Sequence, residues 1–557
     1  MNKDDNAIMK SIPFGIEDFK ELRENDGYFV DKTVLIEDIL KEKNTKAFLF
    51  TRPRRFGKSL NMSMLDAFFN LDYAGKGQKW FEGLRIYDNK ELMALANQDP
   101  VVYFTLKGVR CDDYDNFLTD FRKLMKKVTS DYEYLLGWET ESNIKSDFME
   151  LYNGEADESG LIMSLKTISD ALCRYHGRKA IILMDEYDNP INGSFGMESQ
   201  KKILTFMRYL MTNALKSNES LKFGVVTGVM QIAKESIFSG LNNLYVNNVF
   251  DKDFDECYGF TESEVKEILS YYGHPEKFDE CKEWYDGYRF GNLEVYNPWS
   301  VINYVRKRFE PAAYWGGTSG NDIIETLIRN ADDDTWKKLT DLGNGKTINS
   351  MIRTTVTMND IKGSGADIYS VLVMSGYLNA VPDGDEEYSL SIPNNEMRRV
   401  YAEMMSKELN DGADVQFRKV FNAMREADVQ KVEKTLFDLL DNKIPFFAIS
   451  EESDYQKILA VSAMCTQGKY VTTMESESGN GRVDVKMTSK DVRCPHIVME
   501  LKKTKSDSPD IWQSEAEGAL QQIKDRKYHN GLTGRILLYG ICFHGKEAKV
   551  VMEEVSC

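Results

Sequence analysis

The residues best suited to chemistry follow an apolar segment close to the N-terminus, residues 47–50. The chain continues there as Thr51-Arg52-Pro53-Arg54-Arg55-Phe56-Gly57-Lys58-Ser59-Leu60. An apolar strand that leads through Gly-Lys-Ser into a helix is typical of a loop that holds a nucleoside triphosphate, because backbone N–H groups of the turn and of the helix N-terminus surround the phosphates. Lys58 would contact the β- and γ-phosphates, and the Ser59 hydroxyl would contact Mg²⁺. We therefore predict that residues 51–60 bind ATP.

Arg52 is the main departure from the usual form of this loop. A glycine is expected five residues before Gly57, and Arg52 occupies that position. Pro53, Arg54 and Arg55 then add stiffness and charge to a turn that is normally small and flexible. Arg54 and Arg55 have two interpretations: extra positive charge near the phosphates, or contacts to a second domain. The loop alone does not decide between them.

A second motif supports nucleotide binding. Residues 180–184 are apolar and are followed by Asp185 and Glu186. Such a run predicts a buried parallel strand whose carboxyl end presents the two acids, which is where ligands bind in open α/β sheets. Asp185 would hold the Mg²⁺ shell, and Glu186 would orient or deprotonate the attacking water.

A further strand is predicted over residues 221–229, next to the strand that ends at Asp185. Thr227 lies near its end. Two interpretations of Thr227 have equal weight. In the first interpretation, its hydroxyl contacts the γ-phosphate or the water that attacks it. In the second, Thr227 and Gly228 form an ordinary turn at the end of the strand.

A second group of chemical residues lies near the C-terminus. A predicted strand over residues 482–486 contains Asp484, and another over residues 497–502 contains Glu500 and Lys502. Side chains alternate along a strand, so Glu500 and Lys502 share one face, and a neighbouring strand could place Asp484 beside them. Two carboxylates there would bind Mg²⁺, and the lysine would position or activate water for cutting a phosphodiester bond. The alternative is a solvated strand face.

Composition limits the class of protein. The chain has 557 residues, which suggests three or four domains, and its net charge of −18 argues against a surface coated for nonspecific nucleic-acid binding but leaves room for a local basic cleft. Eight scattered cysteines indicate neither disulfides nor a zinc site. We expect a cytoplasmic protein without a membrane partner, because no apolar run reaches the roughly 20 residues of a membrane span.

The order of the predicted elements gives a domain organisation. Strands and helices alternate from residue 47 to residue 229, which predicts a parallel sheet covered on both faces, and the region from 256 to 410 has a mainly helical pattern. The aromatic residues at 284–288 and 296–299 would pack a helical lid or stack on bases. We predict an ATPase domain at 1–255 with an N-terminal segment, a helical lid or linker at 256–410, and a third domain at 411–557.

Several motifs together resemble a known family. Ile12-Pro13-Phe14-Gly15, the loop from Thr51 to Ser59, Leu183-Met184-Asp185-Glu186-Tyr187-Asp188, Thr227-Gly228-Val229 with Ser239-Gly240-Leu241-Asn242-Asn243, and Trp284-Tyr285-Asp286-Gly287-Tyr288 are similar to bacterial AAA-ATPase-like proteins, which usually carry a C-terminal PD-(D/E)xK nuclease domain. In that family the missing first glycine is normal. The resemblance implies a P-loop NTPase domain, a mainly helical middle region and a C-terminal α/β restriction-endonuclease-like domain.

The resemblance also implies residue roles. Lys58 and Ser59 would be ligands of the phosphates and of Mg²⁺, Asp185 and Glu186 the acidic pair, and Asp484, Glu500 and Lys502 the nuclease core. A helix-borne glutamate is expected before the nuclease strands, and Glu452 is the candidate.

The leading hypothesis is an ATPase coupled to a Mg²⁺-dependent nuclease that acts on nucleic acid. DNA is favoured over RNA as the expected substrate. The alternative is an ATP-driven switch that binds nucleic acid or a protein partner through a nuclease-like domain that does not cut. A third reading is an ATPase that remodels protein partners, and ring-forming ATPases suggest a homo-oligomer by analogy.

Overall fold

The chain packs into two compact units in a computed structural model. The structure describes residues 9–139, 143–232, 241–316, 324, 327–328, 331–356, 365–384, 387–409, 414–443, 452–464, 470–478 and 481–556. The first unit comprises residues 1–314, 352–362 and 366–376, and the second comprises residues 315–351, 363–365 and 377–557. The predicted domain boundaries at residues 255 and 410 stay predictions.

The first unit is built on a five-stranded sheet of β1 (Ala47–Thr51), β2 (Val101–Thr105), β3 (Ala180–Asp185), β4 (Leu221–Gly228) and β6 (Leu244–Asn247). The spatial order is β2-β3-β4-β1-β6, and every pair is parallel. All residues of β1 and β3 are buried, as expected for parallel strands covered on both faces. The expectation of an α/β parallel sheet is confirmed, with β6 as an additional short strand.

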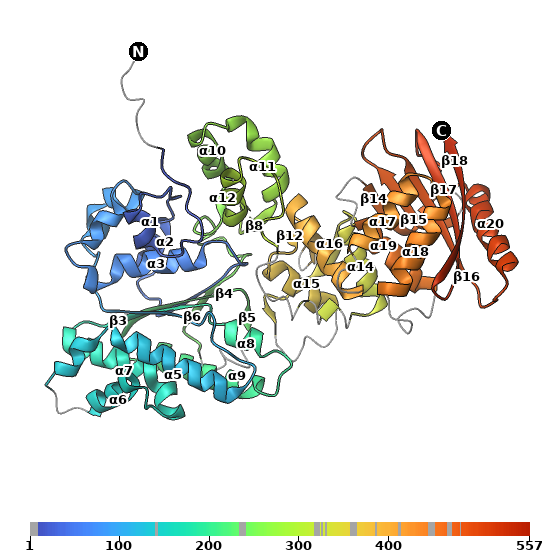
Figure 1. The fold of residues 1–557 in the computed structure, drawn as a ribbon. Coiled ribbons are helices and arrows are strands. Elements are labelled where there is room, and N and C mark those ends of the chain that lie inside the picture. Colours follow the sequence, from blue (N-terminus) through green and yellow to red (C-terminus); the bar gives the residue numbers. More distant parts are fainter. Residues whose placement is uncertain are drawn as a thin grey trace, which may run out of the picture. The chain divides into compact units, whose positions relative to one another are not determined.

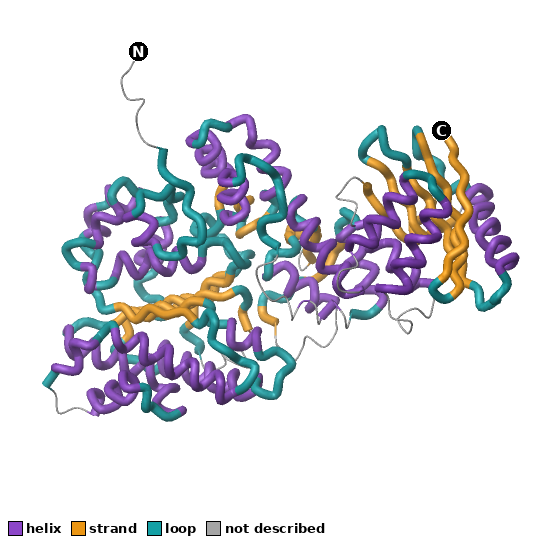
Figure 2. Tube along the Cα trace, in the orientation of Figure 1, coloured by secondary structure: helices purple, strands orange, loops and turns teal. Residues whose placement is uncertain are grey.

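Helices cover both faces of this sheet (Figures 1 and 2). On one face lie α1 (Phe19–Glu24), α2 (Val34–Lys41) and α3 (Lys58–Phe69), and on the other lie α5 (Tyr114–Ser130), α6 (Asn143–Asn153), α7 (Glu158–His176) and α9 (Gln200–Leu215). The second group buries its apolar stripes in one continuous core that includes Phe117, Leu165 and Phe206.

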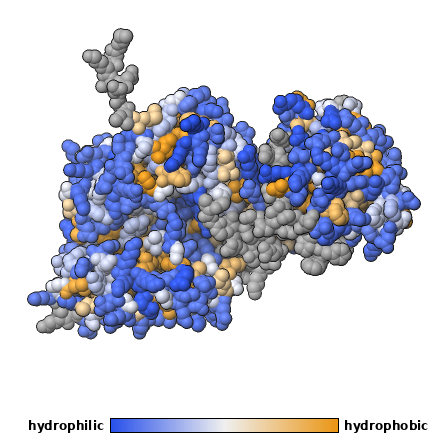
Figure 3. Space-filling view, viewed as in Figure 1, coloured by the Kyte–Doolittle hydropathy of each residue, from blue (hydrophilic) through white to orange (hydrophobic). Residues whose placement is uncertain are grey.

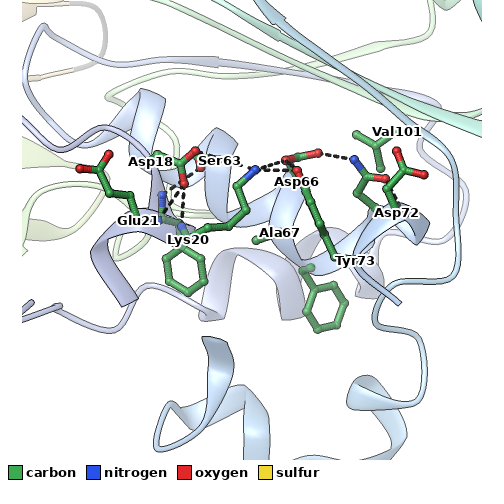
Figure 4. A network of polar contacts seen from close by, with 12 residues as sticks. Asp18, Lys20, Glu21, Ser63, Asp66, Ala67, Asp72, Tyr73 and Val101 are labelled. Atoms are coloured by element: carbon green, nitrogen blue, oxygen red, sulfur yellow. Dashed lines mark hydrogen bonds and ion pairs between the residues drawn. The ribbon is translucent and has the colours of Figure 1, made fainter. Parts of the chain in front are cut away.

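A polar network joins the N-terminal segment to α3 (Figure 4). The Lys20 ammonium donates to Asp66 Oδ2 at 3.1 Å and to the Tyr73 hydroxyl at 2.6 Å. Asn70 donates to the other oxygen of Asp66 at 2.9 Å, and the backbone N–H of Phe19 donates to the Ser63 hydroxyl at 2.9 Å. The segment before β1 is therefore fixed to the helix that follows the phosphate-binding loop.

The rest of the first unit is helical with short strands. It contains α10 (Glu262–Tyr271), α11 (Phe278–Tyr285), α12 (Pro298–Arg306) and the antiparallel strands β7 (Phe260–Thr261), β9 (Leu293–Tyr296) and β8 (Tyr288–Phe290), while β5 (Gln231–Ile232) pairs with β11 (Thr355–Val356). Tyr285, Tyr288 and Tyr296 of the predicted aromatic cluster are buried, so they pack as core residues and are not available to stack on bases. Ser239 and Gly240 lie outside the described residues.

The second unit has two sheets. One is the antiparallel β10 (Ile348–Met351), β13 (Glu387–Ser391) and β12 (Asn379–Pro382). The other has the order β14 (Tyr470–Ser478), β15 (Gly481–Ser489), β16 (His496–Lys503), β17 (Arg535–His544) and β18 (Glu547–Ser556), in which β16 and β17 are parallel and the other pairs antiparallel.

Helices flank the five-stranded sheet (Figure 1). They are α17 (Asp414–Arg425), α18 (Val429–Lys443) and α19 (Glu452–Met464) on one side and α20 (Pro509–Arg526) on the other. The helices α14 (Asp333–Gly343) and α16 (Asn395–Leu409) come earlier in this unit, whereas α15 (Gly365–Met374) belongs to the first unit from Ala366 onward. The helix α20 connects the parallel strands β16 and β17, as such a crossover requires. A Cβ atom on Gly540 of β17 would lie 2.1 Å from the Ala516 carbonyl oxygen, so the missing side chain allows α20 to pack closely.

The surface seen in Figure 3 is mostly hydrophilic, with apolar side chains in small groups. Among the residues that the structure describes, no helix combines the length and the apolar character needed to cross a membrane.

Candidate nucleotide and nuclease sites

The predicted phosphate-binding loop joins the carboxyl end of β1 to the N-terminus of α3. Gly57 is the N-cap of α3 and has φ 86°, a left-handed conformation that glycine adopts at no steric cost. Lys58 is buried, and its ammonium donates to the carbonyls of Arg52 and Pro53 at 2.9 Å each. Burial lowers the pKa of Lys58, against the attraction of the Asp185 carboxylate.

Ser59, Asp185 and Thr227 meet at the ends of three neighbouring elements. Ser59 Oγ donates to Asp185 Oδ2 at 2.6 Å, and the Thr227 hydroxyl donates to Asp185 Oδ1. Asp185 is 1% exposed. A serine hydroxyl next to a carboxylate fits a Mg²⁺ site, because Mg²⁺ prefers oxygen ligands and keeps several waters. The structure thus brings together three residues that the sequence separates widely.

Glu186 follows Asp185 directly and has φ 53°, a backbone conformation that costs a non-glycine residue free energy and is common at functional sites. Burial raises the pKa of Glu186, and the neighbouring Asp185 charge raises it further. A carboxylate with a raised pKa accepts a proton more readily at neutral pH.

Tyr187 and Asp188 fix the turn after Glu186 to the end of β4, and their roles were missed in the sequence. Asp188 Oδ2 accepts from the backbone N–H of Val229 at 2.9 Å and of Met230 at 3.2 Å. The Tyr187 hydroxyl donates to the Met230 carbonyl at 2.7 Å. The only sequence signal was their position directly after the two acids.

The Arg52 side chain points away from the turn and into the protein. Its guanidinium is fully buried and donates to the Asn247 side chain at 2.6 Å, and the carbonyls of Thr51 and Asn247 accept from it at 2.9 and 3.1 Å. The rings of Tyr258 and Phe290 lie 5.0 and 5.2 Å from it. Arg52 therefore connects β1 to β6 and to the aromatic residues beyond it, and only its backbone belongs to the loop surface.

The remaining loop residues differ in exposure. Phe56 is buried against the rings of Tyr288 and Phe290. Thr51 and Pro53 are buried, and Pro53 lies beside Gly376. Arg54, Ser59 and Leu60 are half-buried. Arg55 has φ 70° and stacks its guanidinium on Trp299, with 4.3 Å between the two groups. Arg55 thus contacts a residue of the first unit outside the loop, and the choice between its two interpretations stays a prediction.

The second candidate site lies on β15 and β16. Asp484 Oδ2 accepts from the backbone N–H of Leu501 at 2.7 Å, and the Lys502 ammonium lies 3.6 Å from Glu500 Oε1. Glu500 is 2% exposed, and its Oε2 is buried without a hydrogen-bond partner. Burial and the Asp484 charge, opposed by Lys502, raise the pKa of Glu500 to about 7. The three predicted residues therefore lie together.

Two glutamines complete this site. Gln456 on α19 donates to Asp484 Oδ1 at 3.1 Å, and Gln522 on α20 donates to Glu500 Oε1. Gln521 and Lys524 of α20 contact Asp525 and Glu553 instead. Glu452 is half-buried in the first turn of α19, one helical turn before Gln456.

These residues suit a divalent cation. Within the described ranges, no three His, Cys, Asp or Glu side chains gather closely enough to hold a metal ion. Asp484 and the unpartnered oxygen of Glu500 would supply two carboxylates, and water and substrate oxygens would fill the remaining positions, as is usual for Mg²⁺.

Comparison with known proteins agrees with this division of the chain. Residues 13–238 match the family model described as a predicted AAA-ATPase, and residues 450–553 match that of the PD-(D/E)XK nuclease superfamily. The chain carries these two domains. The AAA-ATPase-like domain contains the phosphate-binding loop with Asp185 and Thr227, and the nuclease-superfamily domain contains Asp484, Glu500 and Lys502.

A relative matches along nearly the full length of the chain. It is described as an uncharacterized protein in the vnfD 5′ region of Azotobacter chroococcum mcd 1 and is 26% identical over 565 residues, which cover 97% of this chain and 98% of the relative. The expected resemblance to an AAA-ATPase-like protein with a C-terminal nuclease-superfamily domain is confirmed.

Proposed function

We propose that the protein binds and hydrolyses ATP with Mg²⁺ at the phosphate-binding loop and thereby controls Mg²⁺-dependent cleavage of nucleic acid by its C-terminal domain. The observation that carries the proposal is the pair of acidic centres, one around Asp185 and one around Glu500, each in the domain whose family uses such residues.

In the ATPase centre, Lys58 and the backbone of residues 53–59 would hold the phosphates, and Ser59 with Asp185 would hold Mg²⁺. Mg²⁺ would neutralise the charge on the transferred phosphoryl group. Glu186, whose pKa is raised by burial, would take the proton of the attacking water. Thr227, whose hydroxyl donates to Asp185, would orient that water.

In the nuclease centre, Asp484 and Glu500 would hold the cation, and Gln456 and Gln522 would keep the two carboxylates in place. A bound cation would polarise the scissile phosphate. Lys502 would position the attacking water or stabilise the developing charge, because its ammonium lies within 3.6 Å of Glu500.

The ATPase is tested with Lys58→Ala and Glu186→Gln, with the exposed Lys41→Ala as a matched control. We expect Lys58→Ala to abolish nucleotide binding, because it removes the ammonium that would contact the phosphates, and Glu186→Gln to bind ATP but hydrolyse it at least about 100-fold more slowly. Nucleotide binding is measured by fluorescence of a labelled ATP analogue. Unchanged turnover in Lys58→Ala would remove the loop from the mechanism.

The nuclease is tested with labelled single- and double-stranded DNA and RNA, with Mg²⁺ or Mn²⁺, and with and without ATP. We expect cleavage by the wild type that is lost in Glu500→Ala and Lys502→Ala and retained in Lys503→Ala, which changes the adjacent lysine on the opposite side of β16. If the wild type binds these nucleic acids but never cuts them, the non-cutting switch is the correct function.

A further inference from the structure

Within the described residues, the chain passes from the first unit to the second after Tyr314 and after Gly376, and it returns to the first unit after Met351 and after Gly365. Tyr314 and Gly376 both contact the phosphate-binding loop. We infer that the loop regulates the second unit through these two crossing points, with Arg55 holding the first and Pro53 the second. The inference rests on the proposed function for the binding of a nucleotide, and it specifies how that nucleotide would be sensed.

Arg55 holds the first crossing point. Its Nη1 donates to the Tyr314 carbonyl at 3.2 Å, and the indole N–H of Trp299 donates to the same oxygen at 3.0 Å. The Arg55 guanidinium also lies over the Trp299 ring at 4.3 Å. Two side chains, those of Arg55 and Trp299, therefore hold the carbonyl of the residue just before the first crossing point next to the loop.

The contact of Arg55 with Trp299 belongs to a longer stack. Phe14 lies on Trp299 with 5.2 Å between ring centroids, and the Arg306 guanidinium lies 4.2 Å from the Phe14 ring. Arg306, Phe14, Trp299 and Arg55 thus form a stack with a cation at each end and two aromatic rings between them, and both the cation–ring and the ring–ring contacts are favourable. The stack gives Arg55 a fixed support in spite of its φ of 70°.

Pro53 contacts the second crossing point. Gly376 has φ 87°, and a Cβ atom built on it would lie 2.8 Å from the Pro53 Cβ. Any other residue at position 376 would therefore be strained in its backbone and would press against the loop. Pro53 and Gly376 are therefore in close contact, and a displacement of the loop toward Gly376 would press on it.

The residues that follow the two crossing points contact each other within the second unit. The rings of Trp315 and Tyr377 meet edge to face at 5.0 Å, and both side chains are buried. The N–H of Trp315 donates to Glu396 on α16 at 2.8 Å. Each crossing is thus one peptide bond between a residue that contacts the loop and a residue in the second unit's core.

A bound nucleotide has a direct way to displace the loop. Lys58 now donates to the carbonyls of Arg52 and Pro53. Phosphates compete for this ammonium, because a charged acceptor forms a stronger hydrogen bond than a carbonyl. Loss of the two Lys58 contacts frees the backbone on either side of Pro53, next to Arg55. The nucleotide would therefore favour a loop arrangement without these contacts, and this shift between two loop arrangements would regulate the second unit.

The experiment is hydrogen exchange measured by mass spectrometry on the full-length protein, with and without a non-hydrolysable ATP analogue and Mg²⁺. The informative peptides cover residues 315–316 and 377–384. The test variant is Trp299→Leu, which removes the indole donor to Tyr314 and the ring under Arg55. The control is Trp138→Leu, which changes a half-buried tryptophan of the same unit that meets Tyr175 edge to face. A second test variant, Gly376→Ala, acts at the other crossing point.

In the wild type and in Trp138→Leu, we expect the analogue to change exchange of these peptides by about fivefold or more, a typical size for coupling between sites. In Trp299→Leu and Gly376→Ala, we expect the change to fall below about twofold. In Trp299→Leu, which changes a side chain outside the loop, the dissociation constant of the analogue should stay within about threefold of the wild type. Fluorescence titration of the analogue gives that constant and shows whether each variant is folded.

Two results would overturn the inference. One is an analogue that binds the wild type without altering exchange in the second unit, and the other is a full response in both test variants. If the analogue does not bind the wild type at all, the proposed ATPase function fails first and the inference fails with it.

Discussion

Glu500→Gln removes a charge that the folded protein holds at a high cost. Glu500 is 2% exposed, and burial together with Asp484 raises its pKa from the ordinary value of 4.5 to about 7. Below pH 4.5 the carboxyl is protonated in the folded and unfolded protein, so its charge does not affect stability. Above pH 7 the carboxyl is ionised in both states, and the shift in its pKa then lowers the free energy of unfolding by its full amount.

The cost follows from the shift in pKa. It amounts to about 1 kcal/mol at pH 5 and about 3 kcal/mol at pH 8, since each pKa unit is worth about 1.4 kcal/mol. Glutamine keeps the shape and the acceptor for Gln522 but has no charge. Glu500→Gln should therefore stabilise β16 by about 3 kcal/mol at pH 8 and by much less at pH 5, in the absence of divalent metal.

The assay is native-state hydrogen exchange of the peptide over residues 496–503 in EDTA, corrected for the pH dependence of intrinsic exchange, which reports the free energy of local opening. Glu517→Gln changes an exposed glutamate of α20 and should alter this free energy by less than about 0.5 kcal/mol at either pH. An equal gain for Glu500→Gln at pH 5 and pH 8, or a loss at pH 8, would refute the reasoning. Added Mg²⁺ should stabilise the wild type and leave Glu500→Gln unchanged.

Three further predictions concern contacts that support the sites. Lys20→Met should lower the free energy of unfolding of the first unit by about 3 kcal/mol, because Asp66 loses its buried cation; denaturant titration measures this, and a change below 1 kcal/mol would contradict it. Asp188→Ala should reduce ATP turnover more than nucleotide affinity, because it releases the N–H groups of Val229 and Met230 after β4. These contacts hold Thr227 and Glu186 in place. Equal losses in kcat and affinity would argue against a positioning role. Gly540→Ala should force α20 away from β17, because the new Cβ would meet the Ala516 carbonyl. The melting temperature should fall and cleavage should weaken. A melting temperature equal to that of the wild type would show that the helix shifts without cost.

The fold of the first unit could be predicted well because its signals are local. Buried parallel strands appear as short apolar runs, and β1, β3 and β4 match the predicted residues almost to the ends. β6 was missed because its four residues, Leu244–Asn247, have no such run, and it joins the sheet only through pairing with β1.

The candidate sites were predictable to the extent that strand positions bring their residues together. Asp185 and Thr227 lie at the carboxyl ends of neighbouring parallel strands and therefore meet. Asp484 and Glu500 lie in the middle of the antiparallel strands β15 and β16, next to the paired residues Val485 and Met499, and they meet through that register. The directions of the Arg52 and Arg55 side chains could not be predicted, because their partners Asn247 and Trp299 come from distant segments. Gln456 was missed because nothing in its neighbourhood marks it as different from a surface helix residue.

The buried position of Arg52 has a consequence for how the protein acquires its nucleotide site during folding. Arg52 and Asn247 are separated by 195 residues in the sequence. A glycine in the same position would let the loop form from local contacts alone, whereas this loop reaches its final shape only after β6 has joined the sheet. Non-local contacts form slowly, since the chain between them must first be ordered. In refolding experiments the ability to bind ATP should therefore appear after most of the helical signal has returned, and an Arg52→Gly variant, although closer to the common motif, should refold to a less stable site.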